Sequence, residues 1–323
     1  MPQGVDLAIP FPSRVSADVA RAAADHLAWP RSFGLLPDAE SETRHLQGNY
    51  PELAGRFHPT AVGAQLDLAI DQLSWFFLFD DAFDGPWGRT PALAAQLVGR
   101  VERVLDQQGE ETAPYPIAAA FADLWSRSRE GMSEGWCRRA AANWRAYMRG
   151  YVTEAEVRLD QRKPTLQQQL SLRAVTIGVC PILDLAERLG HRELPTPLAS
   201  SYSLDILRRL ASEVVALDND IVSVEKEEAI GDANLVLHFE SERNLTRGEA
   251  IEVIRTMVAD RTSEFVSLGG KLLESAKDLE PHARDATHRY YHDALCAVMR
   301  GAYDWEQTCS RYRPDYATAE SPV

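Results

Sequence analysis

Three aspartates lie close together in the sequence FFLFDDAFD, which covers residues 76–84. Asp80 and Asp84 are four residues apart and Asp81 and Asp84 are three apart, so on a helix their carboxylates share one face. Clustered carboxylates beside an apolar wall repel one another unless a cation neutralises them. Oxygen ligands at this spacing suit Mg²⁺, which also accepts phosphate oxygens. The alternative is a solvated acidic helix end that stops at Gly85.

A second group of oxygen ligands follows in the sequence LDNDIVSVEKEE, residues 217–228. Asn219, Ser223 and Glu227 fall at i, i+4 and i+8, so on a helix they form one stripe that drifts by only about 80°. An amide oxygen, a hydroxyl and a carboxylate are all hard ligands, and together they predict a site for a further divalent ion. Lys226 lies beside the stripe, where it can hold a phosphate as a point charge. The alternative is an ordinary polar helix face.

A lone arginine and a helix-breaking signal occur together in LRAVTIGVCPIL, residues 172–183. Arg173 lies in an otherwise apolar helix, where it either forms a structural ion pair or binds an anion. Pro181 has no N–H and its ring crowds the carbonyl of Ile177, while Gly178 loosens the same turn. The pattern predicts a break that leaves the Ile177 carbonyl free to point into the interior, near Arg173. A kink without a functional role is the alternative.

Arg311 and Tyr312 end the last predicted helix and precede Pro314. An Arg–Tyr pair on a mobile chain end can close over an anion and donate several hydrogen bonds to it. The simpler alternative for this pair alone is a surface position.

The elements that must position these residues are helices. Apolar residues recur at spacings of three and four over residues 61–83, 140–159, 166–189, 202–224, 250–273 and 283–312. There is no alternating strand pattern, and glycine- and proline-rich turns fall between the helices. We therefore expect an all-α chain with one domain over residues 1–316, built from roughly ten or more helices around a common interior. Residues 317–323 are expected to form a flexible tail.

The composition limits the class of protein. The 323 residues are 45% hydrophobic and carry a formal net charge of −14, from 48 acidic and 34 basic residues. Such a charge argues against nucleic acid as a partner, and an anionic substrate would need local cations or bound metal ions. The four cysteines are widely spaced and predict free thiols. There is no signal-peptide pattern and no apolar run long enough for a membrane span, so we expect a cytoplasmic protein.

The four segments, in this order, resemble the motifs of the bacterial class I terpene synthases, and most of all those of sesquiterpene synthases. The DDxxD motif of that family is similar to Asp80, Asp81 and Asp84, and its (N/D)Dxx(S/T)xxxE motif is similar to residues 219–227. The usual lysine before the last glutamate is present as Lys226. The resemblance covers nearly the whole chain, from about residue 10 to residue 312.

Further family features surround the break. The diphosphate-sensing arginine of the family is similar to Arg173, and its C-terminal RY pair to Arg311 and Tyr312. At the break, Thr176 resembles the linker and Ile177 the effector, with Gly178 beside them. The usual PT before the sensor helix is present at residues 164–165, whereas a common tyrosine is replaced by glutamine, at residue 169.

The resemblance implies an α-bundle around a central active-site cavity that binds three Mg²⁺ ions. Asp80, with Asp81 or Asp84 assisting, would hold two ions, and Asn219, Ser223 and Glu227 would hold the third. The diphosphate would be bound by three cations and one phenol: Arg173, Lys226, Arg311 and Tyr312. Of the three aspartates, Asp80 is the expected direct ligand, whereas Asp81 and Asp84 bind metal on closure or anchor basic residues of the lid.

The implied reaction is ionisation of a prenyl diphosphate, followed by cyclisation of the carbocation to a terpene hydrocarbon or alcohol in a dry cavity. Phe76, Phe77 and Trp305 are the expected aromatic cavity residues. Farnesyl diphosphate is favoured as substrate, and geranylgeranyl diphosphate is the alternative. The prenyl diphosphate is the expected partner, with a homodimer as one possible assembly.

Two other classes of protein compete with this interpretation. A chain-elongating prenyltransferase shares the fold, but it would normally carry a second DDxxD where this chain has DNDIVSVEKE. A non-catalytic helical binding module would have no need of oxygen ligands on apolar helices.

Overall fold

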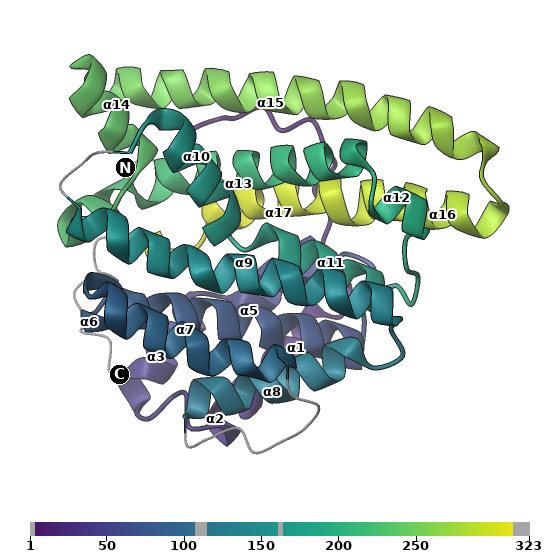
Figure 1. The fold of residues 1–323 in the computed structure, drawn as a ribbon, viewed down its shortest axis with the longest axis horizontal. Helices are drawn as coiled ribbons and strands as arrows, with labels where there is room; N and C mark the ends of the chain where they lie inside the picture. Colours follow the sequence, from purple (N-terminus) through teal and green to yellow (C-terminus); the bar gives the residue numbers. More distant parts are fainter. Residues whose placement is uncertain (1–3, 107–114, 161–163, 313–323) are drawn as a thin grey trace.

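Helices of very different length make up the structure, a computed structural model that describes residues 4–106, 115–160 and 164–312 (Figure 1). The first half comprises α1 (Val19–Asp25), α2 (Ala28–Ser32), α3 (Ala39–Gln47), α4 (Tyr50–Phe57), α5 (Ala64–Phe83), α6 (Pro86–Arg89), α7 (Pro91–Asp106), α8 (Pro116–Arg129) and α9 (Glu134–Leu159). The second half comprises α10 (Leu166–Thr176), α11 (Val179–Leu189), α12 (Thr196–Ala199), α13 (Tyr202–Ile230), α14 (Leu235–Arg243), α15 (Arg247–Ser275), η1 (Ala276–Asp278), α16 (Pro281–Arg289), η2 (Tyr290–Leu295), α17 (Cys296–Glu306) and η3 (Ser310–Tyr312). The described residues contain no β-strand, so the predicted all-α class is confirmed, while the predicted tail at residues 317–323 lies outside them.

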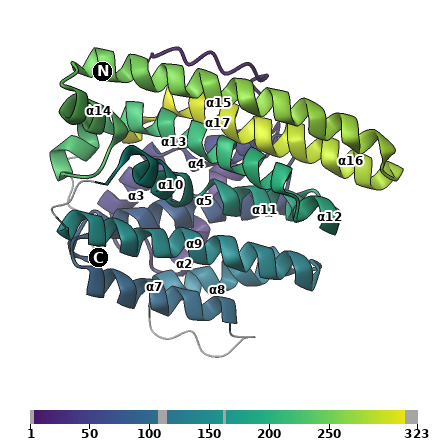
Figure 2. The same cartoon turned by 45° about the horizontal axis from the view of Figure 1, so that its top comes forward.

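Two helices form the interior of the bundle. Helix α13 packs against α10, α11, α15 and α17, and helix α5 packs against α4, α8 and α11. Both views show α15 running along the outer side of α13 (Figures 1 and 2). The middle of α13 is buried on every side of the helix, and this buried stretch includes the polar residues Ser212, Glu213, Asp218 and Asp220. The two segments rich in oxygen ligands therefore lie on two helices that each pack against several others.

The predicted break between α10 and α11 is confirmed. Helix α10 ends at Thr176, and Gly178 has a φ of 76° before α11 begins at Val179. Pro181 falls in the first turn of α11, where a missing N–H removes no helical hydrogen bond. A Cβ on Gly178 would lie 3.0 Å from the Phe76 ring. Glycine is thus needed here for both its left-handed conformation and its small size.

The same helix pair explains the most apolar stretch among the described residues. Contrary to the expectation from the sequence, residues 166–189 are by length and composition alone apolar enough to cross a membrane. In the structure this stretch is α10 and α11 with the break between them, and 56% of its most apolar window is buried inside the bundle. Its hydropathy is that of core helices.

The C-terminal segment differs from the prediction of one helix over residues 283–312. The chain forms α16, then the π-helix η2, and then α17, which ends at Glu306. The carbonyl of Trp305 accepts hydrogen bonds from the backbone N–H groups of Thr308 and Cys309, at 3.0 and 2.8 Å, which turns the chain back. Residues 311 and 312 consequently lie on the separate 3₁₀ turn η3 and do not end a long helix.

Two adjacent glycines in α15 give a matched test of the packing. A Cβ on Gly269 would lie 2.1 Å from the ring of Tyr291, whereas a Cβ on Gly270 would meet nothing within 4 Å. We expect Gly269→Ala to lower the free energy of unfolding by about 1–3 kcal/mol through overpacking. Gly270→Ala should raise it by up to about 1 kcal/mol, because alanine is the better helix former. Urea denaturation of both variants measures this difference, and equal effects would contradict the packing of η2 on α15.

Candidate active site

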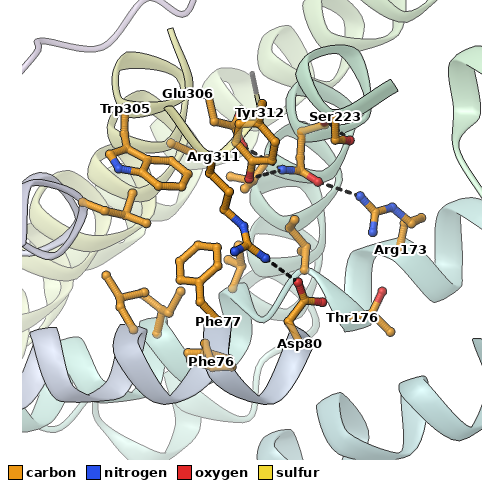
Figure 3. Close-up of a pocket in the computed structure, with 18 of the residues that line it drawn as sticks. Phe76, Phe77, Asp80, Arg173, Thr176, Ser223, Trp305, Glu306, Arg311 and Tyr312 are labelled. Carbon is orange, nitrogen blue, oxygen red and sulfur yellow. Dashed lines mark hydrogen bonds and ion pairs between the residues drawn. The ribbon is translucent and has the colours of Figure 1, made fainter. Parts of the chain in front are cut away.

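The central cavity opens among α4, α5, α9, α10, α11, α13, α17 and η3, and Figure 3 shows its polar end. Apolar side chains form one part of its wall: Leu53, Phe57, Leu73, Phe76, Phe77, Val179, Ile182, Val215, Ala302 and Trp305. Polar side chains gather in the other part: Asp80, Tyr147, Tyr151, Arg173, Thr176, Asn219, Ser223, Lys226, Glu227, Glu306, Arg311 and Tyr312. The cavity therefore has an apolar region for a hydrocarbon and a region of ionic groups.

Arg311 joins the two sides of the polar region. Its Nη2 lies 3.0 Å from Asp80 Oδ2 and 2.6 Å from Asp81 Oδ1, and its guanidinium carbon lies 4.8 Å from the centre of the Phe77 ring (Figure 3). Only 2% of the Arg311 residue is exposed. Burial favours the neutral acid at Asp81, but the Arg311 guanidinium outweighs it and lowers the pKa of Asp81. The short turn η3 is thus held to the end of α5 by charge.

A second ion pair closes the same side. Lys226 Nζ on α13 lies 3.0 Å from Asp84 Oδ2. Burial raises the pKa of Asp84 to about 6, against the opposing effect of Lys226. Burial also opposes the charge on Lys226, but the carboxylates of Asp84, Asp80 and Asp81 raise its pKa. The cation at 226 remains protonated at neutral pH because three acids surround it.

Arg173 faces the second motif. Its Nε donates to Asp220 Oδ1 at 2.8 Å and its Nη2 donates to Asn219 Oδ1 at 2.9 Å. Asp220 is fully buried, and its other oxygen accepts the backbone N–H of Leu235 at 2.9 Å, at the start of α14. The acid at 220 therefore serves as a structural partner for Arg173 and α14, and it does not line the cavity.

The stripe predicted on α13 lies on one side of the cavity. Asn219, Ser223 and Glu227 all line it, and the Ser223 hydroxyl donates to the Asn219 carbonyl at 2.7 Å. The side chain of Asn234 donates to Glu227 Oε2 at 2.7 Å, which fixes that carboxyl. Burial raises the pKa of Glu227 to about 8, and Arg173 opposes this effect. The Glu227 carboxyl thus lies near the positive charge of Arg173, and a bound cation would further favour its ionised form.

The sequence interpretation missed several polar residues of the cavity. Tyr151 on α9 donates to Asp80 Oδ1 at 3.1 Å, and the hydroxyls of Tyr147 and Tyr151 lie 2.9 Å apart. These tyrosines are four residues apart in a predicted helix, a spacing that places them on one face. Glu306 accepts a hydrogen bond from Asn219 Nδ2 at 3.0 Å. No local spacing connects residues 219 and 306, so this contact appears only in the fold.

The central cavity is lined by all the predicted site residues except Asp81, Asp84 and Gly178. Asp81 turns toward Arg311 and lines a separate pocket on the other side of α5, together with Tyr50 and Trp87. Gly178 shapes the break without lining the cavity. Thr176 and Ile177, from the same break, do line it. Asp84 lies at the polar mouth, in a pocket that shares Asp80, Lys226 and Glu227 with the central cavity.

The donor set fits a hard divalent cation. Asp80, Asn219, Ser223 and Glu227 offer carboxylate, amide and hydroxyl oxygens to one cavity, and Mg²⁺ prefers such ligands. Among the described residues, however, no three His, Cys, Asp or Glu side chains converge on one metal position. Two of the four donors, Asn219 and Ser223, are not of these types, and Arg311 and Lys226 pair with the acids of α5. A metal ion held by Asp80 would have to displace Arg311 from that carboxylate.

Comparison with known proteins identifies the family. The family described as "Terpene synthase family 2, C-terminal metal binding" matches residues 71–264. A pentalenene synthase from Streptomyces arenae is 45% identical over 323 residues, which cover 99% of this chain and 96% of that protein. A (−)-β-caryophyllene synthase from Saccharothrix espanaensis, named as cyclising (2E,6E)-farnesyl diphosphate, is 39% identical and covers 98% and 91%.

Solved structures agree with these matches. A linalool/nerolidol synthase from Streptomyces clavuligerus is 35% identical, with a TM-score of 0.85 and coverage of 95% of this chain and 100% of that one. A cucumene synthase is 32% identical, with a TM-score of 0.83 and coverage of 93% and 99%.

The ion pairs of Arg311 make a prediction about the metal-free protein. Arg311→Ala leaves Asp81 without its cation, so the free energy of unfolding in EDTA should fall by about 3 kcal/mol. Arg138→Ala removes an exposed pair with Glu134 on α9 and should leave the free energy of unfolding unchanged. Equilibrium denaturation in urea measures both variants. Equal stability of the Arg311→Ala variant and the parent would contradict the pairing described for η3 and α5.

Proposed function

The chain belongs to terpene synthase family 2, and from this we propose that it is a magnesium-dependent sesquiterpene cyclase that acts on farnesyl diphosphate. As a terpene synthase it is a lyase of prenyl diphosphates, and the family is one with a metal-binding domain. Beyond the family and the reaction class, we propose the substrate, the metal ion and the role of each residue.

The observation that carries the proposal is the division of the central cavity into two regions. The polar region presents Arg173, Lys226, Arg311 and the Tyr312 hydroxyl beside the oxygen ligands of α5 and α13. The apolar region is lined by aromatic and aliphatic side chains. A prenyl diphosphate has the same division, with a highly charged head and a hydrocarbon chain.

In the proposed reaction the cations grip the leaving group. Arg173, Lys226 and Arg311 face the polar region from α10, α13 and η3, so they surround the diphosphate from three sides. Negative charge grows on the diphosphate as the carbon–oxygen bond breaks, and preorganised donors stabilise that charge more than they stabilise the bound substrate. The Tyr312 hydroxyl adds a neutral donor at the same place.

The metal ions are expected at the oxygen ligands. Asp80, with Asp81 or Asp84 assisting, would hold two Mg²⁺ ions, and Asn219, Ser223 and Glu227 would hold a third. When bound, Mg²⁺ supplies Lewis-acid stabilisation of the departing diphosphate. On binding, Asp80 has to give up its contact with Arg311, which frees that guanidinium for the diphosphate.

The apolar region protects and steers the carbocation. Phe76, Phe77 and Trp305 line it, and an aromatic face stabilises a passing cation by roughly 0.5–2 kcal/mol. Ile177, at the break between α10 and α11, also lines the cavity. Its carbonyl receives no helical hydrogen bond from residue 181, because Pro181 has no backbone N–H. Exclusion of water from this region prevents early quenching of the cation.

Farnesyl diphosphate is proposed because the family resemblance is strongest to sesquiterpene synthases. The name of the caryophyllene synthase relative includes that substrate, and the pentalenene synthase relative covers 99% of this chain. Geranylgeranyl diphosphate is the alternative substrate, and the same assay distinguishes the two.

The test combines both metal motifs. We expect Asp80→Ala with Glu227→Ala to lower the turnover of farnesyl diphosphate by at least about 100-fold, because each change removes a carboxylate ligand. Product is measured by GC–MS in Mg²⁺ buffer, and circular dichroism checks that the variant is folded. Glu228→Ala is the control, since Glu228 is exposed on the same helix and pairs with Arg247, so it should keep the parent rate.

Three results decide between the alternatives. Turnover of farnesyl diphosphate that persists in excess EDTA, or at the parent rate in the folded double variant, would contradict the proposed mechanism. Cyclic products from geranylgeranyl diphosphate alone would assign the diterpene reaction. Depletion of no prenyl diphosphate by the parent protein would favour a binding module.

A further inference from the structure

The side chain of Asn219 is held by three elements at once. Its Nδ2 donates to Glu306 Oε1 at 3.0 Å and to the Tyr312 hydroxyl at 2.8 Å, while its Oδ1 accepts from Arg173 Nη2 at 2.9 Å. Glu306 is on α17, Tyr312 on η3 and Arg173 on α10. Both hydrogens of the amide and its oxygen are therefore engaged in fixed directions.

The chemistry of the neighbours sets the orientation of this amide. An arginine can only donate, so the side of residue 219 that faces Arg173 has to be an oxygen. The Glu306 oxygen that faces residue 219 acts as an acceptor, so the opposite side has to be a donor. An asparagine satisfies both demands, whereas an aspartate places an oxygen against the Glu306 oxygen.

Glu306 is itself held in place. Only 3% of it is exposed, and its carboxyl shares one proton in a hydrogen bond with the carboxyl of Asp218, which is 2% exposed and precedes Asn219 on α13. That proton lies on the Asp218 side, so the Glu306 oxygen that faces Asn219 is left as an acceptor. The Glu306 side chain is directed toward the polar end of the cavity, near Tyr312 (Figure 3). With Asp218 on one side and Asn219 on the other, this carboxyl has little freedom to turn away from residue 219.

We propose that Glu306 is a positioning residue that requires an amide at position 219 and turns its oxygen toward Arg173 and the metal side of the cavity. This inference rests on the proposed function for its catalytic consequence, though not for the contact itself. The family motif accepts Asn or Asp at this position, and in this chain Glu306, which is 87 positions away in the sequence and in direct contact with residue 219, requires Asn.

The same hydrogen bonds orient the hydroxyl of Tyr312. Because its oxygen accepts from Asn219, its own O–H is left to point elsewhere, which includes the side where the diphosphate is expected. An aspartate at 219 would instead draw the O–H of Tyr312 to itself. The amide thus keeps both the metal ligand and the diphosphate donor in their proposed roles.

A glutamine at 306 provides the matched variant. Toward Asn219 it can present its carbonyl, with its NH₂ turned to Asp218, so Glu306→Gln keeps the contact. Toward an aspartate at 219 it can present its NH₂ instead, while its carbonyl accepts the proton of the Asp218 carboxyl that Glu306 otherwise shares. Glu306→Gln should therefore tolerate either residue at 219, whereas Glu306 tolerates only the amide.

The experiment is a double-mutant cycle of Asn219→Asp and Glu306→Gln, with two measurements on each purified protein. The first is the thermal midpoint in EDTA, and the second is the affinity for inorganic diphosphate at fixed Mg²⁺, by calorimetry. We expect Asn219→Asp alone to lower the midpoint by about 3 °C or more and the affinity by about tenfold or more. Glu306→Gln alone should stay within about twofold of the parent affinity, and the double variant should recover most of both losses.

A further variant keeps the test informative if Asn219→Asp does not fold. Glu306→Leu removes the acceptor without adding a charge, so it should weaken diphosphate binding by about tenfold while Glu306→Gln does not. The proposal is overturned if Asn219→Asp matches the parent in both measurements. It is also overturned if the double variant is as impaired as Asn219→Asp, or if Glu306→Leu binds like the parent.

The two measurements separate this inference from the proposed function. A parent protein that binds no diphosphate with Mg²⁺ would count against the proposed function. In that case the midpoints in EDTA alone would still show whether residues 219 and 306 are coupled.

Discussion

The site depends on the pairing of each carboxylate at the end of α5 with a cation from another part of the chain. Arg311 pairs with Asp80 and Asp81, and Lys226 pairs with Asp84. Several acids beside an apolar cavity are tolerated only when opposite charge neutralises them. The metal-free protein achieves this with its own cations. In the proposed reaction the substrate complex replaces these pairs, because metal ions go to the carboxylates and the diphosphate goes to the cations.

Four features of the fold place these charged residues: helices α5 and α13, the break at Gly178 and the turn η3. Helices α5 and α13 both pack inside the bundle, and each carries one group of oxygen ligands. The break at Gly178 brings Ile177 to the cavity wall while Arg173, one turn earlier, reaches α13. The turn η3 depends on its ion pairs with α5 and on its contact with Asn219. Charge, and not a continuous helix, therefore decides where the C-terminal residues of the site lie.

The sequence predicted what is encoded locally. The helices, the stripe at 219, 223 and 227, and the break before Pro181 all follow from spacings of three or four residues or from proline and glycine. Contacts between distant residues could not be predicted in this way. The turn of Asp81 away from the cavity, the burial of Asp220 beside Leu235 and the contact of Glu306 with Asn219 each join separate elements. The end of α17 at Glu306 was missed because Trp305, Cys309 and Tyr312 continue the apolar spacing of four and three residues through the turn.

The central claim is that the ion pairs of the metal-free site exchange partners when metal and diphosphate bind. A crystal structure of the protein with Mg²⁺ and inorganic diphosphate tests it most directly. The account predicts Mg²⁺ on Asp80 and on Asn219, Ser223 and Glu227, with Arg173, Lys226, Arg311 and Tyr312 on the diphosphate. A complex in which Arg311 keeps both its bonds to Asp80 and Asp81 while the diphosphate binds elsewhere would contradict it.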